Sequence, residues 1–204
     1  MIRLFITATD TGAGKTVFAG LLCRYFLELD QTVRYIKPVQ TGHPPDDDAA
    51  EVRKRSGLPL ERTQTLFTGK EPVAPCFLFD PFPYDQVVQR INAVSDCDVL
   101  VVEGAGGLLV PLDSRRQMFE LIRDCRLHPL VVVPNRLGCL NHAQLNDRFL
   151  NSEGLPLHGF VVNNHFAVDS HFQEQNFKML QKLLPGKIHA VFDRELELLG
   201  NGWE

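Results

Sequence analysis

A glycine-bearing stretch that ends in Gly-Lys-Thr limits the fold of this chain more than any other feature. Residues 2–7 are apolar and β-prone, residues 9–14 are a polar loop, and residues 15–29 carry apolar side chains at helical spacing. Such a loop presents backbone N–H groups at a helix start, where the helix dipole favours phosphate. Lys15 can bridge the outer phosphates, and the Thr16 hydroxyl can ligate Mg²⁺. We therefore predict a phosphate-binding loop (P-loop) that uses Gly12, Ala13, Gly14, Lys15, Thr16 and Val17.

Strands and helices are expected to alternate along the rest of the chain. Apolar runs predict strands at residues 33–36, 99–102, 130–133, 160–163 and 187–191, and helical spacing predicts helices at 48–56, 84–94, 117–126, 138–150 and 170–184. Proline-rich residues 59–83 predict an irregular loop with one or two short turns. This order predicts an α/β, P-loop NTPase-like fold, with helices on both faces of a mostly parallel sheet. Since no linker divides the chain, we expect one P-loop α/β domain over residues 1–204.

Composition argues against several classes of protein. A net charge of -4 over 204 residues, with only a short basic run at residues 53–55, argues against a nucleic-acid partner. We expect neither a membrane span nor a signal peptide, because no apolar stretch is long enough and the chain moves directly into the first predicted strand. The five cysteines include no C-x-x-C pair, so we expect reduced thiols in a cytoplasmic protein.

Four motifs follow one another in a fixed order. The P-loop reads T-x-T-D-T-G-x-G-K-T over residues 7–16, and residues 37–42 read K-P-V-Q-T-G. Residues 103–107 read E-G-A-G-G, with V-P-L at 110–112, and residues 137–142 read L-G-C-L-N-H. Together these motifs resemble the dethiobiotin synthetase family. Ala8 stands where that family has glycine, and Ala13 stands where it has valine.

The resemblance implies an ATP-dependent ligase. The family adds CO₂ to one amine of 7,8-diaminononanoate, phosphorylates the resulting carbamate with ATP, and closes a cyclic urea with the second amine. Negative charge gathers beside the γ-phosphate in these steps, so catalysis depends on positioning and on cations. By resemblance, Lys15 and Lys37 flank the carbamate and the γ-phosphate. The hydroxyls of Thr11 and Thr41 would contact the carbamate or a substrate amine.

The same resemblance implies Mg²⁺ as the cofactor, bound by oxygen ligands. Thr16 is one expected ligand. Glu103 is a second, because it follows an all-apolar strand, where an unpaired carboxylate is costly. The third comes from the acidic run before the helix at 48–56. The family's Asp-Ala pair matches Asp48, while Asp46 and Asp47 stay open as alternatives, since aspartate also suits a helix N-cap.

The remaining motifs imply substrate and base contacts. Gly106 and Gly107 would let the backbone approach the substrate closely. The helix start at Gly138, with Asn141, would hold the substrate carboxylate. In the family this segment reaches the site across a homodimer interface, so we expect a homodimer. Asn163 matches the family's adenine-reading asparagine, although the proline that usually follows it is missing.

A second interpretation is a P-loop ATPase of the partitioning and septum-positioning class, which acts as a dimerising switch. That class resembles G-K-G-G-x-G-K-[ST], with an additional lysine near the loop start, and residues 9–12 contain no lysine. Relatives that amidate cobyrinate carry a glutaminase domain, for which this chain has no room. A binding protein without catalysis is the last alternative. The motifs therefore favour the ligase.

Overall fold

One sheet organises the part of the chain that the structure describes. The structure is a computed structural model, and it describes residues 1–155, 157–167 and 169–199. The strands are β1 (Ile2–Ala8), β2 (Val33–Gln40), β3 (Thr63–Thr68), β4 (Val99–Glu103), β5 (His128–Pro134), β6 (Gly159–Asn163), β7 (Ile188–Phe192) and β8 (Leu196–Leu198). Their order across the sheet is β3-β2-β4-β1-β5-β6-β7-β8. Every neighbouring pair is parallel except β7 and β8, so the predicted mostly parallel sheet is confirmed.

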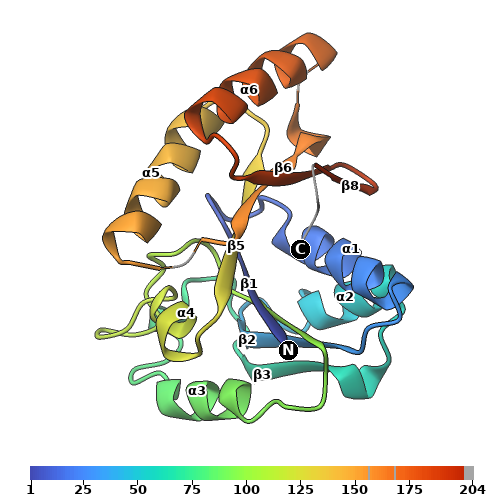
Figure 1. Cartoon of the computed structure of the whole chain (residues 1–204). Coiled ribbons are helices and arrows are strands. Elements are labelled where there is room, and N and C mark those ends of the chain that lie inside the picture. The colour runs from blue at the N-terminus through green and yellow to red at the C-terminus, as the bar shows by residue number, and fades with distance from the viewer. Residues whose placement is uncertain (156, 168, 200–204) are drawn as a thin grey trace.

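Helices cover both faces of this sheet, as predicted (Figure 1). One face carries α1 (Lys15–Glu28) and α2 (Asp48–Ser56). The other carries α3 (Tyr84–Asn92), α4 (Glu120–Asp124), α5 (Cys139–Ser152) and α6 (Ser170–Leu183). Side chains alternate between the two faces of β1: Leu4 and Ile6 belong to the core under α1, and Phe5 belongs to the opposite core. Both faces are buried, which explains why β4 and β5 are continuously apolar.

The strand predicted at residues 33–36 is longer than expected. It continues through Pro38 to Gln40 as β2. The ladder between β2 and β4 ends at the pair of Ile36 and Val102, so Pro38 lies beyond it. On the other side, β3 pairs with residues 37 and 39. Pro38 therefore removes no ladder hydrogen bond, which is the usual condition for proline in a strand.

Three further elements differ from the sequence prediction. The predicted loop at 59–83 contains β3, along with the 3₁₀ turns Leu60–Arg62 and Pro75–Phe77. The segment Thr-Gln-Thr-Leu-Phe-Thr has neither a continuous apolar run nor a strict alternation, so its sequence does not indicate a strand. The helix predicted at 117–126 shortens to α4, because Gln117 forms a β-bridge with Pro111. Strand β8 was not predicted, and it adds an antiparallel edge to the sheet.

Residues 200–204 of the predicted single domain lie outside the described residues, so that boundary stays a proposal. None of the described helices has both the length and the apolar character of a membrane span.

The strand order decides where the motifs meet. Strand β4 lies between β1 and β2, and all three run in the same direction. Their carboxyl ends therefore lie side by side, and these ends carry the P-loop, Lys37 and Glu103. Ligands of parallel α/β sheets bind at this edge.

Candidate active site

The loop between β1 and α1 has the backbone geometry that phosphate binding requires. Gly14 begins α1 with a φ of 97°, in the left-handed region that favours glycine. A Cβ atom there would lie 2.4 Å from Nδ2 of Asn163, so the position has no room for a side chain. Among the described residues no side chain caps α1. The N–H groups of its first turn are therefore available to an anion.

Glu103 lies at the centre of the site. Its side chain is fully buried at the end of β4. The Oε1 atom accepts hydrogen bonds from the Thr16 hydroxyl at 2.9 Å and from Lys37 Nζ at 2.8 Å. The Oε2 atom accepts one from the Tyr35 hydroxyl at 2.8 Å. Lys37 also donates to the carbonyl oxygen of Gly104 at 3.1 Å. A buried carboxylate is thus fully partnered, as its burial demands.

The three candidate aspartates have different surroundings. Asp48 Oδ2 lies 2.5 Å from Lys37 Nζ, so Lys37 is held between two carboxylates. Asp47 is the N-cap of α2, and its carboxylate accepts a hydrogen bond from the backbone of that helix. The Asp46 carboxylate lies against Gly42. Of the three, Asp48 shares the cluster with Glu103.

The charges of this cluster are strongly coupled. Burial lowers the pKa of Lys37, but the Glu103 and Asp48 carboxylates outweigh burial and raise it overall. Burial likewise raises the pKa of Asp48, and Lys37 outweighs that effect and lowers it. The pKa of Lys15 is lowered, first by burial and then by the nearby Lys37. Lys37 is therefore held as a cation by its two carboxylate neighbours.

A polar cavity of about 610 Å³ opens above this cluster. It collects most of the predicted site. Its lining includes Thr11, Gly12, Gly14, Lys15, Thr16, Val17, Lys37, Thr41, Asp48, Glu103 and Gly106. Ala13, which belongs to the same loop, is fully buried and does not line the cavity.

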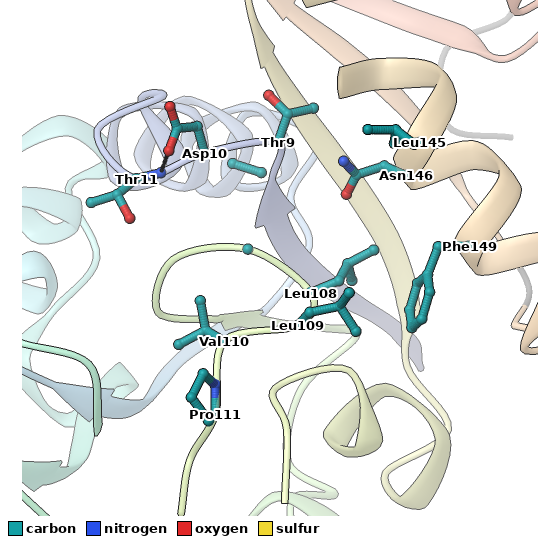
Figure 2. Close-up of a pocket in the computed structure, with 12 residues that line it drawn as sticks. Thr9, Asp10, Thr11, Leu108, Leu109, Val110, Pro111, Leu145, Asn146 and Phe149 are labelled. Atoms are coloured by element: carbon teal, nitrogen blue, oxygen red, sulfur yellow. Dashed lines mark hydrogen bonds between the residues drawn. The ribbon is translucent and has the colours of Figure 1, made fainter. Parts of the chain in front are cut away.

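A second, more apolar cavity of about 430 Å³ adjoins the loop (Figure 2). Leu109 and Val110 come from the segment after β4, and Leu145 and Phe149 come from α5. Thr11 lines both this cavity and the polar one, so the two are adjacent at this residue. Gly107 also lines the apolar cavity.

Two predicted substrate residues lie apart from these cavities. Gly138 begins α5 with a φ of 94°, and Asn141 is exposed on its first turn. Neither residue lines the polar or the apolar cavity of this chain. The adjoining Leu137 is 91% exposed, and Leu145 is 57% exposed. Within the described part of one chain, Gly138 and Asn141 therefore line neither cavity at the P-loop, although Arg136, just before α5, pairs with Asp10 of the loop.

Asn163 contacts the back of the P-loop. Its Nδ2 donates to the carbonyl oxygen of Ala13 at 2.9 Å, and its Oδ1 accepts from the backbone N–H of His165 at 3.1 Å. An amide nitrogen has two hydrogens, and the described residues provide an acceptor for one of them. A cavity of about 370 Å³ lies beside it, lined by Gly12, Gly14, Val17, Arg55, Asn163, His165, Phe166, Asp193 and Arg194.

The donor atoms around Glu103 fit Mg²⁺. Thr16 offers a hydroxyl oxygen, and Asp48 and Glu103 offer carboxylate oxygens, which Mg²⁺ prefers beside phosphates. The described residues contain no group of three or more His, Cys, Asp or Glu that could hold a metal on its own.

Sequence reasoning missed three contacts around the site. Tyr35 was counted only as part of an apolar strand. Gln40 Oε1 accepts from the backbone N–H of Asp48 at 3.3 Å. Arg136 pairs with Asp10 of the P-loop at 2.6 Å. These partners come from different elements, so spacing along the sequence gives no signal for them.

Comparison with solved structures agrees with this geometry. The chain superposes on MinD in the MinC:MinD complex of Aquifex aeolicus with a TM-score of 0.61 at 13% identity, covering 96% of this chain and 82% of that one. It superposes on chloroplast FtsY of Physcomitrella patens with a TM-score of 0.61 at 15% identity, covering 98% and 62%. At these identities the likeness concerns the fold alone. Fold and loop together define a P-loop, nucleotide-binding α/β protein.

Sequence comparison gives the family. The family model described as "AAA domain" matches residues 2–199. An ATP-dependent dethiobiotin synthetase of Bacillus cereus is 31% identical over 192 residues, covering 90% of this chain and 79% of the relative. One of Hydrogenobaculum sp. is 34% identical over 194 residues, covering 91% and 87%. The chain belongs to the ATP-dependent dethiobiotin synthetase family, whose members are ligases.

Proposed function

We propose that this protein uses ATP to carboxylate 7,8-diaminononanoate with CO₂ and to close the ring of dethiobiotin, releasing ADP and phosphate in biotin biosynthesis. One observation carries the proposal beyond family membership. Lys37, Thr16, Glu103 and Asp48 converge beside the P-loop, within hydrogen-bonding or ion-pair distance of one another. Phosphorylation of a carbamate needs this combination of cations and metal ligands at a γ-phosphate.

The first step requires a place for an anion beside ATP. One substrate amine attacks CO₂, and a carbamate forms with loss of a proton. Thr16, Glu103 and Asp48 would hold Mg²⁺, which supplies neutralising charge at the phosphates when bound. Lys37 would leave its position between the two carboxylates and pair with the carbamate. Lys15 would contact the outer phosphates from the start of α1.

The second and third steps transfer phosphate and close the ring. The carbamate oxygen attacks the γ-phosphorus, ADP leaves, and a mixed anhydride forms. The second amine then attacks the carbonyl carbon and loses a proton, the C–O bond to the phosphoryl group breaks, and phosphate leaves. Thr11 stands where the polar and apolar cavities meet, and Thr41 lines the polar one. Their hydroxyls would orient the amines, while Gly106 and Gly107 would let the backbone approach the reacting carbon.

The apolar cavity suits the hydrocarbon chain of the diamine, and the carboxylate at its end needs a partner. We propose that Gly138 and Asn141 provide it from the second subunit of a homodimer. The exposed leucines at positions 137 and 145 support an interface on this face.

Mixing inactive variants tests this shared site. Lys37→Ala and Asn141→Ala should each be inactive alone. After subunit exchange, half of the dimers are mixed and each mixed dimer has one intact site, so activity should return to about a quarter of wild type. Activity no higher than that of the unmixed variants would rule out a site shared in this way.

Two finer assignments belong to the same proposal. The second amide N–H of Asn163 and the adjoining cavity would receive the adenine of ATP. The cysteines are all free thiols, which supports a cytoplasmic location.

The decisive assay separates the ligase from a switch ATPase. Protein, Mg-ATP and bicarbonate are mixed, and phosphate release is measured with and without 7,8-diaminononanoate. We expect release that depends on the diamine and yields a cyclic urea detectable by mass spectrometry. Release that the diamine leaves unchanged would refute the proposal. Lys37→Ala should keep nucleotide binding and lose turnover, whereas a turning-over Lys37→Ala enzyme would contradict the role given to Lys37.

A further inference from the structure

Tyr35 contacts the centre of the site from the core of the protein. It lies on β2, two residues before Lys37, so both side chains leave the same face of that strand. The ladder pairs Tyr35 with Val101, and Glu103 lies two residues farther along the same face of β4. The tyrosine ring is fully buried beneath α1, and its hydroxyl reaches along the face to Glu103 Oε2 at 2.8 Å.

The two oxygens of Glu103 therefore have separate partners. Oε1 accepts from Thr16 and Lys37, the groups that face the polar cavity. Oε2 accepts from Tyr35 on the protein side. Without that hydroxyl, Oε2 would be a buried acceptor lacking this donor, and the carboxylate could rotate to share Lys37 between both oxygens. A rotated carboxylate would change the metal ligand and the position of Lys37 together.

We propose that Tyr35 is a positioning residue, whose hydroxyl orients Glu103 so that Oε1 is presented to the metal and to Lys37. The inference rests on the proposed function only through Glu103 as a metal ligand. It explains why a polar hydroxyl occurs in an otherwise apolar stretch of core. Partners that orient a metal ligand typically change metal affinity or activity by about 10- to 100-fold when removed.

The first test is the affinity for Mn²⁺, a spectroscopic substitute for Mg²⁺, in the presence of a non-hydrolysable ATP analogue. Free Mn²⁺ is measured by electron paramagnetic resonance. Tyr35→Phe should bind Mn²⁺ roughly 10- to 100-fold more weakly than wild type. It should bind the analogue with unchanged affinity when metal is absent. In turnover, the KM for Mg²⁺ should rise more than kcat falls.

Tyr84→Phe is the matched control. Tyr84 is also buried, and its hydroxyl also donates to a carboxylate at 2.8 Å, that of Asp124 on the α3–α4 side of the sheet. This variant loses the same kind of hydrogen bond away from the site, so its Mn²⁺ affinity should equal that of wild type. Equal affinities for Tyr35→Phe and wild type, or equal losses in the two variants, would overturn the proposal.

A second measurement keeps Tyr35 in place, so it does not depend on the folding of Tyr35→Phe. The chain has three tyrosines, so ¹³Cζ-tyrosine labelling gives three resonances. Tyr25→Phe and Tyr84→Phe assign the resonance of Tyr35 by elimination. Adding Mg²⁺ to the protein with bound ATP analogue should move the Tyr35 resonance and leave Tyr84 in place. An unchanged chemical shift of the Tyr35 resonance on addition of Mg²⁺ would overturn the inference.

Failure of this inference is distinguishable from failure of the proposed function. Product analysis with 7,8-diaminononanoate tests the reaction, and neither the Mn²⁺ affinity nor the tyrosine resonance depends on that substrate. A protein that makes no dethiobiotin would refute the ligase proposal, while the comparison of Tyr35→Phe with Tyr84→Phe would still decide the role of Tyr35.

Discussion

Replacing Lys37 by methionine should destabilise the protein in the absence of metal far more than a surface lysine replacement does. Lys37 has 4% of its side chain exposed, and it lies between the fully buried Glu103 and Asp48, whose side chain is 24% exposed. Methionine keeps most of the volume and removes the charge. Two carboxylates are then left close together without the ammonium that separates them.

The expected cost follows from what those carboxylates retain. Breaking a buried ion pair by removing one partner costs about 3–5 kcal/mol. Glu103 keeps its hydrogen bonds from Thr16 and Tyr35, and Asp48 can gain water, so we expect the lower end, about 3 kcal/mol. For a chain of this length, that loss corresponds to a decrease in Tm of about 6–12 °C.

Thermal unfolding in chelator measures the loss, with Lys187→Met as the matched control. Lys187 Nζ lies 2.6 Å from Asp147 Oδ1, but its side chain is 35% exposed, so that variant should lose no more than about 1 kcal/mol. Adding Mg²⁺ and ADP should raise the Tm of Lys37→Met more than that of wild type, because the metal supplies the missing cation. Equal Tm losses for the two variants would show that burial of the Lys37 pair has no special energetic role.

Two further predictions concern the P-loop and the pH dependence of stability. Gly14→Ala should abolish nucleotide binding in a calorimetric titration, because a Cβ there meets Asn163 Nδ2 at 2.4 Å. Gly12 also has a positive φ, of 70°, but a Cβ there meets nothing within 4 Å, so Gly12→Ala should still bind measurably. Equal binding by both variants would contradict this account. The pKa of His158 is lowered below 6.5, mainly by burial and to a smaller extent by the neighbouring His189 and His128. The unfolded state therefore binds more protons than the folded state just below that pH, and the free energy of unfolding should fall as pH falls through the window beneath 6.5. In urea titrations His158→Gln should flatten this slope, whereas the exposed His171→Gln should keep it; an unchanged slope in His158→Gln would refute the assignment.

Much of the sheet could be predicted because its central strands are apolar on both faces. The runs at 99–102 and 130–133 contain only apolar residues, which favours burial on both faces. The structure confirms both as strands, extended to Val99–Glu103 and His128–Pro134. Edge strands lack this signal. β3 begins with three polar residues and has prolines on both sides, and β8 has only three residues, so neither is distinguishable from a loop in the sequence.

The motifs predict a list of candidate site residues, but they do not predict how these residues are arranged. Motifs identified Lys37 and Glu103, but their contact depends on β4 pairing with β2, a long-range choice that no local pattern encodes. Tyr35 was missed for the same reason, since its hydroxyl finds its partner on a neighbouring strand. Asp47 and Asp48 could be separated only by geometry. Both residues suit a helix start. In the structure the Asp47 carboxylate accepts a hydrogen bond from the backbone N–H of Ala50, and the Asp48 carboxylate pairs with Lys37.

We propose that the position of Lys37 links metal binding to catalysis. Its ammonium now neutralises the same two carboxylates that are expected to bind Mg²⁺, so metal and ammonium compete for one set of oxygens. A divalent cation between Glu103 and Asp48 would repel Lys37 and weaken its hold on both. The displaced side chain would then have an ammonium to offer to the next anion in the cavity, and the carbamate is that anion. In this proposal Lys37 stays paired with the two carboxylates until the metal binds, and only then is its charge available to an anion beside the nucleotide.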